Sequence, residues 1–361
     1  MTNSNRFAKS LRLFALIASV TALSMAGAGV TTVDSLLIKE QGSFFVGGRT
    51  IYTDALTGNP DGFLGTGVNN GHITVEQMYV QYQIPEGAAA HVPVVMLHGC
   101  CLSSKSYETT PDGRMGWNEY FLRKHRAVYL PDQVSRARSG FDATIYNEIK
   151  LGKRPPSDMP EIRTATHELA WVLFRFGPEM GKPFPNEQFP VEAYDEFGKQ
   201  VIPDLNAELP SPNPTWTNLS GLAIKLKGAI LMGHSESGFF PEQAALINPE
   251  EIRGLITIES LCPALNADQI SGLAKIPTLV VFGDHIDDVG AYPKMWRERF
   301  DGCAKFVEQM KAAGGDATMM HLPKYGQFGN SHMLMLDKNN LQVADLILKW
   351  IDEHVDNKKR R

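Results

Sequence analysis

The segment GHSESG holds a serine, Ser235, between small residues. It follows an apolar run at residues 229–232 and precedes a helical pattern at residues 239–248. A buried strand that turns sharply through small residues into a helix presents a serine hydroxyl as a nucleophile, as in the G-x-S-x-G motif. Gly233 and Ser237 are the small neighbours, and Ser237 departs from the motif because it stands where a glycine is expected. We predict that Ser235 is a catalytic nucleophile.

A serine hydroxyl is a weak nucleophile until an adjacent base removes its proton. In the chain order serine, acid, histidine, the base follows the serine. Four histidines do so, namely His285, His321, His332 and His354. His332 lies in a polar loop at residues 329–332, after the last expected strand and before the final helix. Such a loop can bring an imidazole over the serine, so we predict that His332 is the base.

Two carboxylates compete for the role of the acid that orients the imidazole. Asp284 follows the apolar run at residues 278–282, and Glu259 follows the run at residues 255–258. Both stand at the carboxyl end of an expected strand, where parallel sheets assemble their sites. The pattern alone slightly favours Asp284. The acidic cluster around Asp284 also fits a solvated loop or, less well, a weak cation site.

An oxyanion formed on the substrate needs two amide donors. One is the N–H after the nucleophile, at Glu236, and the other comes from a loop after an earlier strand. The segment HGCC, which ends with Cys100 and Cys101, follows the apolar run at residues 93–97 and occupies that place. We therefore predict that the oxyanion hole combines the Glu236 amide with an amide of this loop.

The cysteines leave more than one pairing open. Four are present, Cys100, Cys101, Cys262 and Cys303, and four allow three pairings. A bond between neighbours is strained, because adjacent Cα atoms are about 3.8 Å apart whereas disulfides usually span about 4.4–6.8 Å. Spacing alone makes that bond the less expected choice. If it forms, its ring would fix the amide direction before substrate arrives, and Cys262 would pair with Cys303.

Short apolar runs alternate with helical patterns along most of the chain. The expected strands lie at residues 43–52, 78–84, 93–97, 127–130, 229–232, 255–258, 278–282 and 318–321. The expected helices lie at residues 118–124, 242–247, 295–311 and 340–354. Near-continuous apolar strands that alternate with helices are typical of a parallel sheet covered on both faces. We therefore predict an α/β fold with a mostly parallel central sheet.

This alternation stops between residues 141 and 225. A helical pattern at residues 161–176 is followed by a stretch with many prolines. A connection of this length is usually functional or disordered, and it enters just before the nucleophile strand. We predict that residues 141–225, approximately, form an inserted cap that walls the substrate pocket.

Residues 1–28 have the composition of a secretory signal peptide. Three basic residues precede an apolar run at residues 13–23, and small residues end at Ala28. The run is too short to span a bilayer, which disfavours a retained anchor. We expect removal near Ala28, a mature domain at residues 29–361 and a secreted or periplasmic location, where disulfides form. The net charge of -5 gives no footprint for nucleic acid.

Taken together, these motifs resemble those of the secreted bacterial esterases with a vicinal disulfide, the esterase 713 family, which have the α/β-hydrolase fold. The resemblance covers most of the mature chain. It rests on GGR at 47–49, HGCC at 98–101, GHSESG at 233–238, IES at 258–260 and SH at 331–332. It implies that Glu259, in place of Asp284, is the acid, that the Cys101 amide is the second oxyanion donor, and that Cys100 and Cys101 are bonded.

The residues and the resemblance together predict a secreted serine carboxylesterase. It would act through an acyl-enzyme with a Ser-His-Glu triad on a small-molecule ester, without a cofactor, a metal, nucleic acid or a membrane as partner. The same triad could serve a lactonase, an amidase or a C–C bond hydrolase, because a fold does not fix a function. We expect activity to rise with pH through the imidazole range near about 6.5.

Overall fold

The computed structural model describes residues 35–288 and 292–357. The chain from residue 36 onward forms one compact unit. The signal peptide expected at residues 1–28 lies outside the described ranges. Within these ranges, no helix combines the length and the apolar character that crossing a membrane requires.

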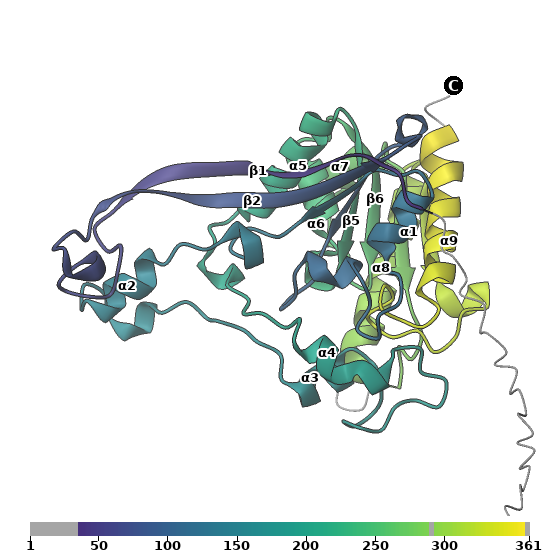
Figure 1. Cartoon of the computed structure of the whole chain (residues 1–361). Helices are drawn as coiled ribbons and strands as arrows, with labels where there is room; N and C mark the ends of the chain where they lie inside the picture. Colours follow the sequence, from purple (N-terminus) through teal and green to yellow (C-terminus); the bar gives the residue numbers. More distant parts are fainter. Residues whose placement is uncertain (1–34, 289–291, 358–361) are drawn as a thin grey trace, which may run out of the picture. The chain divides into compact units, whose positions relative to one another are not determined.

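In the described part of the chain, eight strands form one sheet in the order β1-β2-β4-β3-β5-β6-β7-β8 (Figure 1). The strands are β1 (Ile38–Thr53), β2 (Gly71–Pro85), β3 (Val94–Leu97), β4 (Val128–Pro131), β5 (Ala229–His234), β6 (Ile252–Ile258), β7 (Thr278–Phe282) and β8 (Ala317–His321). β1, β2 and β4 pair antiparallel, and all pairs from β4 to β8 are parallel. The predicted mostly parallel sheet is confirmed, and each expected apolar run overlaps a strand.

The central strands are apolar throughout because both faces of the sheet are buried. In β3, Val94 and Met96 point into one apolar cluster, and Val95 and Leu97 point into the other. Each such side chain contributes about 1.5–3 kcal/mol when it is fully buried. The alternation explains why these strands show no polar face in the sequence.

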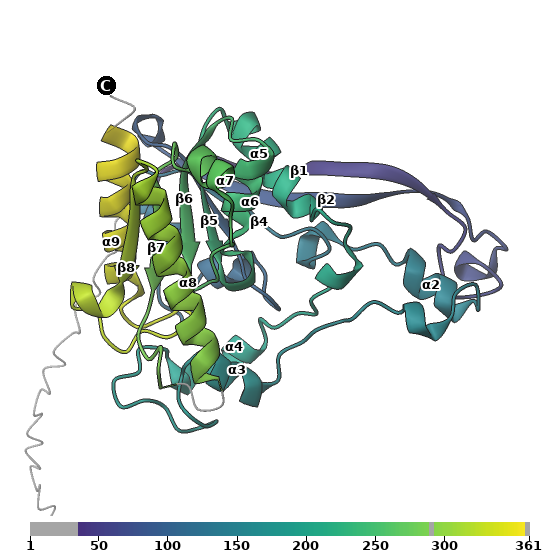
Figure 2. The ribbon, with the colours of Figure 1, turned by 180° about the vertical axis from the view of Figure 1, so that it is seen from behind.

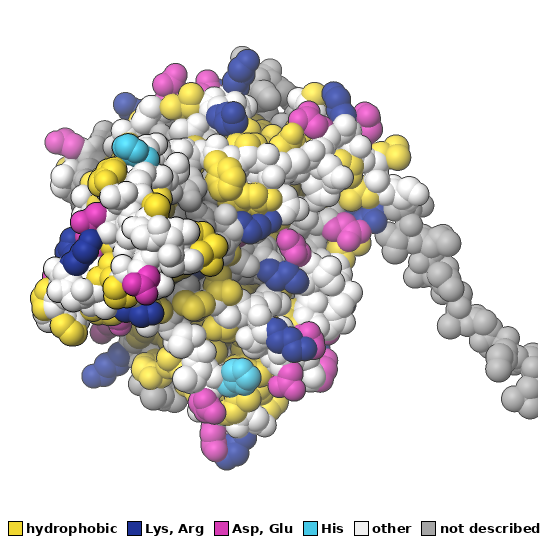
Figure 3. Space-filling model, turned by 60° about the vertical axis from the view of Figure 1, so that its left-hand side comes forward, with side chains coloured by type: hydrophobic (Ala, Val, Ile, Leu, Met, Phe, Trp, Pro, Cys, Tyr) yellow, Lys and Arg dark blue, Asp and Glu magenta, His cyan; other side chains and the backbone are white. Residues whose placement is uncertain are grey.

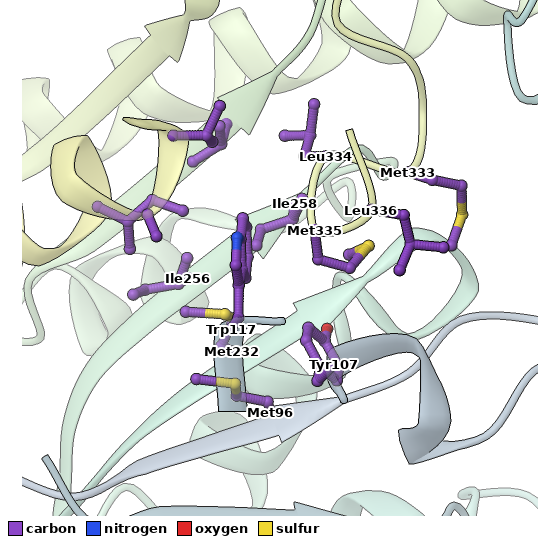
Figure 4. Packing of buried hydrophobic residues seen from close by; sticks show 14 of the residues in the cluster. Met96, Tyr107, Trp117, Met232, Ile256, Ile258, Met333, Leu334, Met335 and Leu336 are labelled. Carbon is purple, nitrogen blue, oxygen red and sulfur yellow. The ribbon is translucent and has the colours of Figure 1, made fainter. Parts of the chain in front are cut away.

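Helices cover both faces of the sheet, as Figures 1 and 2 show from opposite sides. These helices are α1 (Trp117–Arg123), α5 (Pro214–Leu226), α6 (Phe240–Ile247), α7 (Ala267–Leu273), α8 (Pro293–Ala312) and α9 (Asn340–Ile351). α1 and α9 pack into the first cluster, and α5 to α8 pack into the second. In the first cluster, Trp117 and Tyr107 lie among methionine and isoleucine side chains of the strands and the segment at residues 333–336 (Figure 4).

The hairpin of β1 and β2 is longer than the sequence pattern indicated. The helix α2 (Thr144–Lys150) lies at the far end of this hairpin (Figure 1). Its Asn147 side chain donates a hydrogen bond to the carbonyl of Ala55 at 2.9 Å. Several apolar side chains of this region are exposed, and among them Leu64 is 86% exposed. On the face seen in Figure 3, basic and acidic side chains are interspersed between the apolar ones.

The segment at residues 141–225 divides into two parts. Its last helix, α5, packs against α6, β1 and β5 and therefore belongs to the layer that covers the sheet. The preceding part carries α2, α3 (His167–Leu173) and α4 (Tyr194–Gly198). Figure 1 shows α3 and α4 beside each other below the sheet.

The helical pattern at residues 161–176 gives a shorter helix than the sequence predicted. Arg163 pairs with Asp204 in an isolated β-bridge, so the chain before α3 is extended. The Thr166 side chain accepts a hydrogen bond from the Leu169 N–H and fixes the start of α3. The backbone of Arg175 has a left-handed conformation, with a φ of 60°, and this prevents the helix from continuing.

A disulfide bond joins Cys262 to Cys303 and closes a separation of 41 residues. It ties the loop after β6 to the buried face of α8, where Cys303 is fully buried. This pairing is confirmed. Cys100 and Cys101 are free cysteines with their sulfur atoms 2.6 Å apart, so the bond that the resemblance implies between them is not made here.

Candidate active site

The chain turns sharply at Ser235, directly after β5. Ser235 has a φ of 58°, a left-handed conformation that costs a non-glycine residue about 1–3 kcal/mol and often marks a functional site. A Cβ at Gly233 would lie 2.1 Å from the carbonyl oxygen of Ser237, and one at Gly238 would lie 2.2 Å from the Cβ of Ser260. Both positions therefore require glycine.

The departure from the glycine motif at Ser237 has a structural use. Ser237 is buried, and its hydroxyl donates toward the carbonyl of His98, with an Oγ–O distance of 2.8 Å. His98 belongs to the loop expected to supply an oxyanion donor. The close approach that the motif assigns to its second glycine is made instead at Gly238, one residue later.

The structure brings Ser235, His332 and Glu259 together in a line. The Ser235 Oγ lies 2.8 Å from the His332 Nε2, and the His332 Nδ1 lies 3.3 Å from the Glu259 Oε2. Glu259 and His332 are at most 1% exposed. With a neutral ring protonated at Nδ1, the imidazole donates to the carboxylate and accepts from the serine hydroxyl. This arrangement can activate a hydroxyl for attack.

Glu259 stands beside His332, and Asp284 does not. The Glu259 Oε1 accepts hydrogen bonds from the Gly283 N–H and from the Arg175 Nη2, the latter at 2.7 Å. The Asp284 carboxylate instead accepts the N–H of Gly329 at 2.8 Å and that of its own neighbour in the chain. Asp284 thus fixes the start of the histidine loop, and the slight preference that the strand pattern gave it as acid does not match the geometry.

Burial and nearby charged groups determine the protonation states of His332 and Glu259. Burial lowers the pKa of His332 to about 4 against the opposing effect of Glu259, and Arg175 and Arg299 lower it further. Burial by itself would raise the pKa of Glu259, but Arg175 and His332 outweigh it and hold this pKa at about 2. At neutral pH the site therefore holds a neutral imidazole and a charged carboxylate.

The loop that carries His332 is anchored on both sides of the imidazole. Ser331 donates its N–H and its hydroxyl to the buried carboxylate of Asp337 at 2.9 and 2.6 Å. The segment at residues 333–336 is fully buried in the first apolar cluster, as Figure 4 shows. The His234 ring, through Nε2, contacts the carbonyl oxygen of His332 at 2.9 Å. The His332 side chain is therefore held by a rigid loop.

The loop with Cys101 lies against Ser235. A Cβ at Gly99 would be 2.6 Å from the Cβ of Ser235. Cys101 has a φ of 59°, its carbonyl accepts the Ile202 N–H at 2.9 Å, and its own N–H has no protein acceptor among the described residues. The Gln133 side chain donates to the carbonyl of His98 at 2.7 Å and steadies the start of the loop.

Behind this loop lies a buried charge cluster that sequence reasoning missed. The Arg136 Nη2 bonds Asp204 and lies 3.4 Å from the Glu236 Oε2, and the Cys100 thiol donates to Asp204 at 3.3 Å. Burial and then the charge of Asp204 raise the pKa of Glu236 to about 7. The Glu236 side chain is thus directed to this cluster.

Two groups of side chains in the described residues are close enough to share a metal ion. One is Cys100, Cys101 and Asp204, and the other is His91 with Asp352 and Asp356. In the first group Arg136 already bonds the carboxylate, and in the second Arg126 does so. In each group a guanidinium already pairs with the carboxylate that a metal cation would need as a ligand.

No protein-family model matches the chain. A solved structure described as a novel bacterial esterase is 47% identical in sequence, covers 89% of this chain and 98% of its own, and has a TM-score of 0.84. A probable secreted lipase, phiG, from a fungus (Fungal sp. strain ATCC 74256) is 24% identical over an alignment of 324 residues, and the match covers 76% of this chain and 86% of the lipase.

Gly233 offers a direct test of the sharp turn. Gly233→Ala should lower the free energy of unfolding by about 1–3 kcal/mol, because the new methyl group overlaps the Ser237 carbonyl. Urea denaturation measures the change. The matched control is Gly302→Ala in α8, where a Cβ meets no atom within 4 Å and alanine should add about 0.5–1 kcal/mol. Equal midpoints for the two variants would contradict this description of the turn.

Proposed function

The chain belongs to the α/β-hydrolase superfamily, among its bacterial esterases, and on that premise we propose that it hydrolyses small-molecule carboxylic esters through an acyl-enzyme formed on Ser235. The observation that carries this proposal is the continuous contact from the Ser235 hydroxyl through the His332 ring to the Glu259 carboxylate. Nucleophile, base and orienting acid are the three roles that acyl transfer requires.

In the proposed reaction, His332 takes the proton of Ser235 through Nε2 as the hydroxyl attacks the ester carbonyl. Glu259 keeps the ring in the tautomer with its proton on Nδ1 and stabilises the imidazolium that forms. His332 then returns the proton to the leaving alcohol. In the second half, the same nitrogen activates water, which releases the acid and restores the serine.

The oxyanion of the tetrahedral intermediate would be held by the amides of Cys101 and Glu236. Both belong to turns that neighbouring bonds fix before substrate arrives: Ser237 holds the HGCC loop, and Ile202 holds the Cys101 carbonyl. Fixed donors of this kind contribute about 3–4 kcal/mol each to lowering the barrier. These groups supply every step, so the proposed reaction uses neither a metal nor a cofactor.

We also propose that the mature protein is exported, to the periplasm or beyond the cell. The composition of residues 1–28 is that of a signal peptide, and the Cys262–Cys303 disulfide suits an oxidising compartment. Cys100 and Cys101 are free thiols in the structure, and we propose that an oxidant of that compartment takes two electrons and two protons from them to form the vicinal bond, since their sulfur atoms lie 2.6 Å apart. The 24% identical relative is a probable secreted lipase.

Removal of the nucleophile tests the proposal. Ser235→Ala should remain folded and lose at least about a thousandfold in turnover of p-nitrophenyl butyrate. Ser271→Ala, at an exposed position of α7, is the control and should keep wild-type turnover. Parallel assays with a lactone and an anilide distinguish an esterase from a lactonase or an amidase. Normal ester cleavage by Ser235→Ala would end the proposal.

The identity of the acid is tested by two isosteric changes. Glu259→Gln should lower kcat by about 100-fold or more, because the amide no longer stabilises the imidazolium and can favour the wrong tautomer. Asp284→Asn should cost less than about tenfold, since it only weakens hydrogen bonds that hold the loop. Steady-state kinetics of both variants decide the order, and a larger loss at Asp284 would move the acid.

The pH dependence of kcat/KM reports the pKa of the catalytic base in the free enzyme. Because burial lowers the pKa of His332 to about 4, the imidazole is neutral and active well below the usual range. On the acid side of the profile, called the acid limb below, kcat/KM should therefore reach half its maximum near pH 4. The sequence alone led us to expect this point at about pH 6.5. Short assays after a pH jump, with circular dichroism as a folding control, measure this limb. A half-maximal value at pH 6.5 or above would show that the buried environment does not act on His332 as described.

A further inference from the structure

The last residue of α3, Leu173, and the two residues after it lie beside the proposed triad. They contact His332, Glu259 and Trp296, whose ring packs against His332. The Leu173 carbonyl accepts the Trp296 Nε1–H at 3.1 Å, and the ring of Trp296 lies 4.7 Å from that of His332. The Phe174 carbonyl accepts the His332 N–H at 2.8 Å. The Phe174 ring also lies 5.0 Å from the imidazole. The inserted segment therefore touches the base through backbone and side chain.

The next residue, Arg175, is bonded to the acid. Its Nη2 donates to the Glu259 Oε1 at 2.7 Å, and its Nε donates to the Asp284 carbonyl at 2.9 Å. Both side chains of the ion pair are 0% exposed. The guanidinium also lies over the Trp296 ring, 4.4 Å from its centroid. Arg175 is thus fixed at three points and cannot reach a substrate in solution.

We propose that Arg175 is a positioning residue for ester hydrolysis, which fixes the Glu259 carboxylate so that only its Oε2 faces the His332 Nδ1. The inference rests on the proposed function and assigns a role to a residue of the inserted segment. A carboxylate held at one oxygen by Arg175 and the Gly283 amide cannot rotate, so the other oxygen keeps one direction. Preorganisation of this kind lowers the barrier because no rearrangement is needed during reaction.

A purely structural ion pair is the alternative role. A buried pair contributes little net stability, because the cost of removing both charges from water offsets their attraction. Here the pair has a further consequence, since the carboxylate must stay charged beside a ring that becomes cationic during reaction. Without Arg175, burial would favour the protonated Glu259, and a protonated acid cannot stabilise an imidazolium.

Other titratable and charged groups also face this centre. They are Arg299 on α8, His234 on β5, His321 on β8, Asp337 in the histidine loop and Glu187 in the inserted segment. Arg299 acts on His332 by charge and lies 5.1 Å from the Trp296 centroid, yet it makes no hydrogen bond to Glu259 in the described structure. Replacing Arg299 therefore removes a nearby positive charge without removing a hydrogen bond to Glu259, so it distinguishes the effect of charge from that of positioning.

Arg175→Met, Arg175→Lys and the control Arg299→Met test the proposal in the full mature chain. Arg175→Met should lower kcat by about 10- to 100-fold with KM within about twofold. Its acid limb should move to higher pH, because both Glu259 and His332 then take up protons more readily. Arg175→Lys should restore the limb and part of kcat. Arg299→Met should keep kcat within about threefold.

A double-mutant cycle keeps the test valid if Arg175→Met is less stable. Each rate is divided by the fraction of protein that a fluorophosphonate labels. In a Glu259→Gln background, Arg175→Met should cost less than about threefold, because Arg175 acts through that carboxylate. An equal loss in both backgrounds, or an unmoved acid limb, overturns the positioning role.

Ser235→Ala is assayed in parallel to separate the two proposals. If Ser235→Ala is inactive and Arg175→Met behaves as wild type, the proposed function stands and the inference about Arg175 falls. If Ser235→Ala retains normal turnover, the proposed function falls, and the inference falls with it.

Discussion

The site depends on keeping one carboxylate charged in a place that excludes water. Glu259 is fully buried at the end of β6, where loss of hydration alone favours its neutral form. The Arg175 guanidinium, the Gly283 amide and the His332 ring together reverse that preference. None of the three is adjacent to Glu259 in the chain, so the fold must bring separate segments to one point. The sheet supplies the proposed acid, a late loop supplies the proposed base, and the segment at residues 141–225 supplies the counter-charge.

The inserted segment supports the site from two sides. At one side, Phe174 and Arg175 contact His332 and Glu259. At the other, the Ile202 amide bonds the Cys101 carbonyl, and Asp204 bonds Arg136 behind the same loop. The position of this segment therefore bears on the direction of the Glu259 carboxylate and of the loop proposed to hold the oxyanion. Changes within it should therefore alter turnover as well as substrate binding.

The sequence predicts the strands well because buried parallel strands are short apolar runs. It also singles out Ser235 and His332 as candidates by their places relative to those runs, and the structure brings these two side chains into contact. It is weaker for the acid. Asp284 and Glu259 stand at equivalent strand ends, and only the backbone amides around Asp284 show that its carboxylate is already occupied. Without the resemblance to a known family, pattern alone would have favoured Asp284. Arg175 gave no signal in the sequence, because its contacts span 84 and 109 residues.

The most direct test of the account is a crystal structure of the mature protein after reaction with a small alkyl phosphonate ester. We predict phosphorus bonded to the Ser235 Oγ, with the phosphoryl oxygen about 2.7–3.1 Å from the amide nitrogens of Cys101 and Glu236. The His332 Nε2 should stay within hydrogen-bond distance of the adduct, with Glu259 beside Nδ1 and Arg175 on the far carboxylate oxygen. An adduct on another residue, or a phosphoryl oxygen directed away from both amides, would contradict it.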